Sequence, residues 1–185
     1  MYLGSAGATS ATPTDALLSP VFLDAFRWIL HAEGGSRLVN DSGGPTKYGV
    51  SQRAFPTLDI DSLTQEQAQR IYLEHYWRPI KGNALPPGLA LVVFDAAVNM
   101  GVPTAIRLLQ TVLRGPVVDG VMGPETVSAA KMYLPRIELI AQYLRLRCSW
   151  YRDLARQSEK HAKYLYGWEM RVFRLALEAG LWRSA

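Results

Sequence analysis

The chain has 185 residues, of which 49% are hydrophobic and 19% are charged. This length and composition predict a globular protein with a substantial core, and they exclude a disordered or coiled-coil chain. The net charge is +4 and is unevenly spread: residues 1–135 hold ten Lys/Arg against eleven Asp/Glu, whereas residues 136–185 hold ten against five. A basic end favours an anionic partner such as a cell-wall polymer, a membrane surface or nucleic acid, unless it reflects solvated helix faces.

The first 18 residues are rich in Ala, Ser, Thr, Gly and Pro, and they predict a flexible leader ahead of a single domain over residues 19–185. They lack the basic and continuous apolar regions of a signal peptide. The longest apolar stretch, Leu89 to Phe94, is too short to span a bilayer. We therefore expect a protein made in the cytoplasm without a signal peptide.

Most of the chain carries helix signals, namely capping residues, first-turn prolines and apolar residues at helical spacing. The predicted helices cover residues 21–33, 64–77, 88–100, 103–113, a short stretch from 124, 135–157 and 160–179, the last stopped by Gly180. Ser19-Pro20 opens the first helix, and Thr64 with Gln67 forms a capping box for the second. Residues 35–52 alone look like strand and turn. The prediction is a mainly α domain with one small β-hairpin near its N-terminus.

Glu33 ends the first predicted helix. It follows Phe22, Phe26 and Ile29 at the spacing of a single helix face, and that face is the core face. Desolvation and the negative end of the helix dipole would both disfavour the charged carboxylate, so we expect Glu33 to keep its proton near neutral pH. A general acid for glycosidic cleavage requires this property. The alternative is a glutamate that merely ends a helix and reaches water.

The segment 41–46, Asp-Ser-Gly-Gly-Pro-Thr, places a second carboxylate and two hydroxyls within reach of Glu33 across the hairpin. Glycosidases need an acid for the leaving oxygen and a partner for water or for the oxocarbenium-like centre. We therefore expect Glu33, Asp41 and Thr46 to be catalytic, and Ser42 and Tyr48 to bind substrate. The glycine-rich turn favours a water held between the two acids, which predicts inversion at the anomeric carbon.

Two polar residues interrupt the apolar helix over residues 88–100. Asp95 and Asn99 lie one turn apart and either line a sugar cleft or bond a neighbouring helix. We expect both to bind substrate, with Asn99 the better candidate for an N-acetyl or hydroxyl contact. The three histidines lack metal-ligand spacing, so we expect neither a metal nor another cofactor.

The blocks E-G-G at 33–35 and D-x-G-G-P-T-x-x-G-V-S at 41–51 resemble the glycoside hydrolase family 108 muramidases, which occur as bacteriophage endolysins and as secretion-associated muramidases. Further matching blocks lie at residues 76–77, 94–101, 109–110, 119–126 and 166–168. Two features depart from the family pattern: no aromatic residue follows the two glycines directly, and the loop before Gly43 is shorter. Asp41 is aligned with the last family aspartate.

This resemblance implies a lysozyme-like helical fold and hydrolysis of the β-1,4 bond between N-acetylmuramic acid and N-acetylglucosamine, with Glu33 as the catalytic glutamate. It divides the domain into a part with Glu33 and the hairpin, residues 19–84, and a helical part that resembles a peptidoglycan-binding module, residues 85–185.

The resemblance also implies a place of action. We expect a monomeric endolysin that binds peptidoglycan glycan strands and no nucleic acid, is released to the periplasm through a holin, and lyses the bacterial cell.

Two other classes compete with this interpretation. A non-catalytic peptidoglycan-binding module would be favoured if Glu33 proved exposed with no polar group facing it. A basic helical nucleic-acid binder is suggested by the C-terminal charge, but the sequence lacks a glycine-turn recognition motif.

Overall fold

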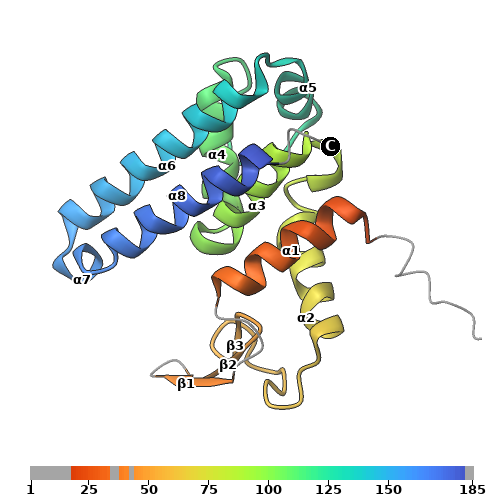
Figure 1. Ribbon diagram of the computed structural model, residues 1–185, viewed down its shortest axis with the longest axis vertical. Helices are drawn as coiled ribbons and strands as arrows, with labels where there is room; N and C mark the ends of the chain where they lie inside the picture. The colour runs from red at the N-terminus through yellow and green to blue at the C-terminus, as the bar shows by residue number, and fades with distance from the viewer. Residues whose placement is uncertain (1–17, 34–37, 42–43, 182–185) are drawn as a thin grey trace, which may run out of the picture.

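The computed structural model describes residues 18–33, 38–41 and 44–181 (Figure 1). The predicted leader over residues 1–18 lies outside these ranges apart from Leu18. Among the described residues, no helix is both long enough and apolar enough to cross a membrane. The fold is mainly α with a small antiparallel sheet near the N-terminus, which confirms the fold class predicted from the sequence.

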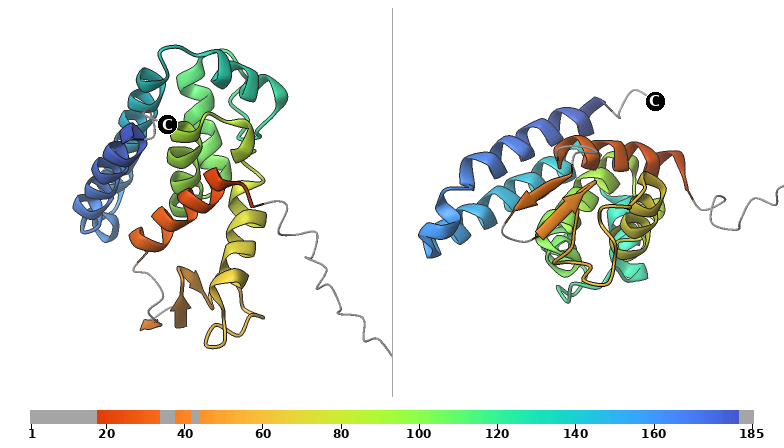
Figure 2. Two further views of the ribbon diagram at one scale, coloured as in Figure 1. Left: turned by 45° about the vertical axis from the view of Figure 1, so that its right-hand side comes forward. Right: turned by 90° about the horizontal axis from the view of Figure 1, so that it is seen from below.

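The N-terminal part begins with α1 (Pro20–Ala32), whose first turn is capped by Ser19. The Ser19 hydroxyl accepts a hydrogen bond from the Phe22 N–H, as the Ser-Pro start signal predicts. One face of α1 is fully buried and consists of Phe22, Ala25, Phe26 and Ile29. This face points α1 at the core and leaves its C-terminal end beside the sheet, as both Figure 1 and Figure 2 show.

The sheet has three short strands in the order β1 (Val39–Asp41), β2 (Gly44–Lys47), β3 (Val50–Ser51). A two-residue turn joins β2 to β3, and both of its residues have positive φ, 54° at Tyr48 and 76° at Gly49. Such a turn follows the right-handed twist of the strands it joins. The predicted hairpin is thus confirmed, and a third strand extends it.

The second helix, α2 (Gln65–Tyr72), starts at the predicted capping box, in which Thr64 and Gln67 satisfy each other's backbone N–H groups. It continues through one wider π-helical turn, η2 (Leu73–Trp77). A single 3₁₀ turn, η3 (Gly82–Ala84), then leads into the third helix.

The centre of the molecule is α3 (Pro87–Met100), which is buried without interruption from Leu89 to Ala97. It packs against α1, α4, α6 and α8, so the all-round apolar pattern reflects contacts on every side. The helices around it are α4 (Val102–Leu113), α5 (Pro124–Met132) and α6 (Arg136–Gln157).

The chain ends in a pair of long neighbouring helices, α6 and α8 (Leu165–Leu181), with the short α7 (Glu159–Ala162) at their turn (Figures 1 and 2). The sequence predicted one helix from about Lys160, and this was wrong: the chain must reverse direction to return along α6, so it breaks after Ala162. The predicted stop at Gly180 was also wrong, because Gly180 lies within α8.

Candidate functional site

The turn between β2 and β3 packs directly on the end of α1. A Cβ atom built on Gly49 would lie 2.3 Å from the Tyr72 hydroxyl oxygen and 3.1 Å from Cβ and Cγ of Glu33. The Tyr72 hydroxyl also donates a hydrogen bond to the Tyr48 carbonyl oxygen, at 3.1 Å. Gly49 is therefore required twice, for its positive φ and for this close approach, and the turn fixes the sheet against Glu33.

A cavity of about 160 Å³ opens at this junction. Its polar lining residues are Glu33 from the end of α1, Tyr72 and Tyr76 from the second helical segment, and Asn99 from the end of α3. Burial, reinforced by the negative charge of Glu33, raises the pKa of both tyrosine hydroxyls. Both tyrosines therefore stay protonated beside Glu33, and the cavity presents a carboxylate together with neutral hydroxyl and amide groups.

Glu33 differs from the sequence-based expectation in its surroundings. Its side chain is 29% exposed, and its carboxylate forms an ion pair with Arg171 of α8, with 2.6 Å between Oε1 and Nη1. The predicted apolar environment is wrong because the buried face of α1 ends at Ile29, whereas Glu33 is the C-cap residue, one turn farther on. The desolvation expected from the sequence is replaced by a specific cationic partner from the other end of the chain.

Arg171 connects Glu33 to Asp95, which is fully buried in α3. The Asp95 carboxylate lies 2.8 Å from Nη2 of Arg171 and 2.7 Å from Nη1 of Arg147, and it accepts a hydrogen bond from the Trp28 indole N–H at 2.8 Å. Burial opposes the charged form, but the two guanidinium groups hold the pKa of Asp95 below its ordinary value. Of the two alternatives for Asp95, the structure supports bonding to neighbouring helices: a residue with no exposed surface does not line a sugar cleft.

The ion pairs of Glu33, Arg171, Asp95 and Arg147 form a network, and Asn99 lies at the surface end of it. Arg147, fully buried, donates hydrogen bonds at 3.0 and 2.9 Å to the Tyr151 hydroxyl, which in turn donates to Oδ1 of Asn99. Asn99 is exposed and lines the same cavity as Glu33. Its side chain is therefore both oriented from behind and open to a ligand, as the sequence-based interpretation requires.

The remaining predicted residues lie elsewhere on the sheet. Thr46 is half-buried in β2, opposite Val39 and Ser51. Neither Thr46 nor Tyr48 is among the described residues that line the 160 Å³ cavity. The backbone of Asp41 ends β1, opposite Gly44, whereas the side chain of Asp41 and all of Ser42 lie outside the described residues.

Sequence reasoning missed the two arginines of this network. An aspartate in the middle of an apolar helix needs a buried cation, so the sequence did carry a signal that some Lys or Arg must reach Asp95. It did not say which of the twenty basic residues would do so. Two of the ten cations counted in the basic C-terminal end, Arg147 and Arg171, are thus used inside the protein.

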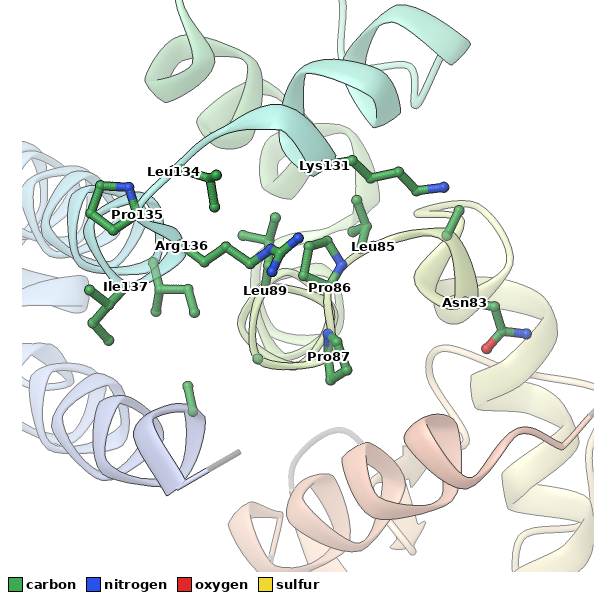
Figure 3. A pocket seen from close by; sticks show the side chains of 14 residues that line it. Asn83, Leu85, Pro86, Pro87, Leu89, Lys131, Leu134, Pro135, Arg136 and Ile137 are labelled. Atoms are coloured by element: carbon green, nitrogen blue, oxygen red, sulfur yellow. The ribbon is translucent and has the colours of Figure 1, made fainter. Parts of the chain in front are cut away.

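A larger cavity lies away from Glu33 (Figure 3). It has a volume of about 790 Å³ and is bounded by the loop before α3 and the start of α6. Lys131 and Arg136 are its charged lining residues, and the described residues around it include no carboxylate. Acid catalysis of the predicted kind needs a carboxyl group, so the smaller cavity at Glu33 is the candidate active site.

Comparisons with known proteins show which families the chain resembles. Residues 26–101 match the family model described as Glycosyl hydrolase 108, and residues 104–173 match the one described as Predicted Peptidoglycan domain. The fold is similar to a solved structure titled "Structure of Brucella abortus SagA", with a TM-score of 0.75, 27% identity, and coverage of 89% of this chain and 96% of that chain. A comparison with curated protein sequences found no match.

The two family matches meet just after α3, and the network crosses their boundary. Glu33, Asp95 and Asn99 lie in the first match, whereas Arg147 and Arg171 lie in the second. The boundary predicted from the sequence was near residue 84, ahead of α3. The polar contacts described above join the two parts through this central helix.

Proposed function

Since this chain belongs to glycosyl hydrolase family 108 and is a glycoside hydrolase that acts on peptidoglycan, we propose that it cleaves the β-1,4 bond between N-acetylmuramic acid and N-acetylglucosamine. The observation that carries this proposal is the position of Glu33, a partly exposed carboxyl group in a cavity whose other polar lining side chains are neutral. In this proposal Glu33 protonates the leaving glycosidic oxygen, and Asn99 contacts an N-acetyl or hydroxyl group of the sugar.

The competing function is a peptidoglycan-binding module without catalysis. From the sequence it would be favoured by an exposed Glu33 that no polar group faces. Instead Glu33 pairs with Arg171 and shares a cavity with Tyr72, Tyr76 and Asn99. These contacts favour the enzyme, because an acid that only ended a helix would need none of them.

The bond that is cut decides between a muramidase and a glucosaminidase. Purified peptidoglycan is digested, the new reducing ends are reduced with borohydride, and the sugar alcohols are identified by mass spectrometry after acid hydrolysis. We expect the alcohol of muramic acid to appear. The alcohol of glucosamine would mean that the other glycosidic bond is cut, and binding without any new reducing end would support the binding module.

The stereochemistry tests the proposed partners of Glu33. We propose that Asp41 and Thr46 position a water on the face of the sugar opposite Glu33, with Ser42 and Tyr48 contacting the substrate, so that the first product is the α-anomer. Early-time NMR of the anomeric protons gives the answer. A β-anomer as the first product would mean retention, which needs a nucleophile at the anomeric carbon, either a carboxylate about 5 Å from that of Glu33 or the N-acetyl group of the sugar itself.

We further propose an endolysin role: the protein acts as a monomer on peptidoglycan glycan strands in the periplasm, after release through a holin, and so lyses the cell. Co-expression tests this proposal. Lysis of a bacterial host that requires both this protein and a pore-forming holin would support it, whereas lysis without a holin would contradict the release route.

A further inference from the structure

Arg171 of α8 forms an ion pair with the candidate catalytic acid, Glu33. The Arg171 side chain is 13% exposed. Its guanidinium group lies between two carboxylates: Nη1 is 2.6 Å from Oε1 of Glu33, whereas Nε and Nη2 are 3.0 and 2.8 Å from Oδ1 of Asp95. A planar guanidinium that binds two carboxylates at once fixes their relative position, which a lysine ammonium cannot do in the same way.

The far side of this bridge is rigid. Asp95 is fully buried and is also held by Arg147 at 2.7 Å and by the indole N–H of Trp28 at 2.8 Å. Arg171 therefore cannot turn away from Glu33 without abandoning a buried carboxylate that depends on its charge. Burial opposes its charge, but Asp95 and Glu33 raise the pKa of the Arg171 guanidinium, so it stays protonated at all ordinary pH values.

We propose that Arg171 is a positioning residue for the general acid: it holds the Glu33 carboxyl group in one orientation at the mouth of the cavity. The inference rests on the proposed function, in which Glu33 is the acid. It assigns a role in catalysis to a residue of the peptidoglycan-domain match, so that the second part of the chain acts on the reaction as well as on binding.

The other groups around Glu33 do not substitute for this charge. Tyr72 and Tyr76 face it as neutral hydroxyls, Asn99 as an amide, and Asp95 lies behind Arg171 with a negative charge. At the end of α1 the nearest titratable neighbour of Glu33 is His31, which lies two residues earlier and is exposed. The turn between β2 and β3 contributes Gly49, which has no side chain. Arg171 is the cation paired with Glu33 among the described ion pairs.

The loss of Arg171 should therefore lower turnover more than affinity. Without the guanidinium, the Glu33 carboxyl group loses the contact at 2.6 Å that fixes its orientation, and a misplaced acid protonates the leaving oxygen less efficiently. A lysine in its place keeps the charge but not the planar contact to two carboxylates.

The experiment compares wild type with Arg171→Gln, Arg171→Lys and the control Arg152→Gln. Arg152 is also a basic residue in an ion pair with a residue of α8, Glu169, but this pair is on the surface. Reducing-end release from soluble peptidoglycan fragments is measured against substrate concentration, so that kcat and KM are obtained separately. Thermal unfolding shows that each variant is folded.

For Arg171→Gln we expect a kcat that is lower by roughly tenfold or more, because a misplaced acid is costly, with little change in KM. Arg171→Lys should recover part of the lost kcat, and Arg152→Gln should match wild type in both constants.

A folded Arg171→Gln variant with the kcat of wild type would overturn the proposal and leave Arg171 a structural residue. If Arg171→Gln does not fold, Arg171→Lys decides, since a wild-type kcat there would overturn the orienting role. The proposed role of Glu33 is tested separately: a Glu33→Gln variant that stays active would contradict it, whatever the activity of the arginine variants.

Discussion

Replacement of Glu33 by Gln is expected to lower turnover of peptidoglycan by about 100-fold or more, because loss of a general acid alone typically costs that much. Gln has the same shape and can still accept a hydrogen bond from Arg171, so the contact between α1 and α8 is kept. The measurement is the rate of reducing-end release by wild type and variant at equal concentration of folded protein.

The control for this variant is Glu169→Gln, the same chemical change in a surface ion pair with Arg152. It should leave turnover at the wild-type level. Binding of Glu33→Gln to whole peptidoglycan should also persist, because Glu33 supplies a proton more than it supplies affinity. Residual activity above roughly a tenth of wild type would be too high for the loss of a general acid, and another group would then have to protonate the leaving oxygen.

Replacement of Asp95 by Asn is expected to lower the free energy of unfolding by about 3–5 kcal/mol, more than any other substitution proposed here. The shape of the side chain is unchanged, but Arg147 and Arg171 lose their shared counter-charge inside the protein. Buried cations without a partner are far more costly than the pair itself is stabilising. Urea unfolding followed by circular dichroism measures the difference.

The matched control is Asp153→Asn, which removes the counter-charge of Arg156 in an exposed pair and should change stability little. The effect at Asp95 also depends on pH. Because the folded-state pKa of Asp95 is lowered, its contribution is complete above about pH 4, the ordinary pKa of an aspartate, and is lost as the pH falls through the folded-state value. The difference in the free energy of unfolding between wild type and Asp95→Asn should therefore become smaller at acid pH. A variant as stable as wild type at neutral pH would contradict the buried network.

The network joins helices from both parts of the fold. Glu33, Arg171, Asp95 and Arg147 alternate in charge, so each arginine of this network is paired with a carboxylate. The same contacts connect α1, α3, α6 and α8, which belong to two different family matches. A shift of the C-terminal helices would therefore change the position of Arg171 and, with it, that of the Glu33 carboxyl group.

The sequence by itself determined the elements whose signals are local. The Ser19-Pro20 start, the capping box at Thr64 and the all-round apolar pattern of α3 each act within a few residues, and the helices begin and lie where these signals place them. The motif around Glu33 likewise singled out this residue as the candidate acid, since a motif is a property of adjacent residues. A hairpin between residues 39 and 51 follows from its turn residues in the same way.

Only the tertiary structure decided what surrounds the acid. The core-face spacing of α1 suggested apolar surroundings for Glu33, but spacing does not say where the packed face stops or what lies beyond it. Arg171 is separated from Glu33 by 138 positions, and it reaches Glu33 because α8 folds back along α6 and packs on α3. The same packing buries Asp95 and leaves Asn99, one turn later, at the surface. Charges and contacts that join distant segments depend on how helices pack, and no local pattern in the chain encodes them.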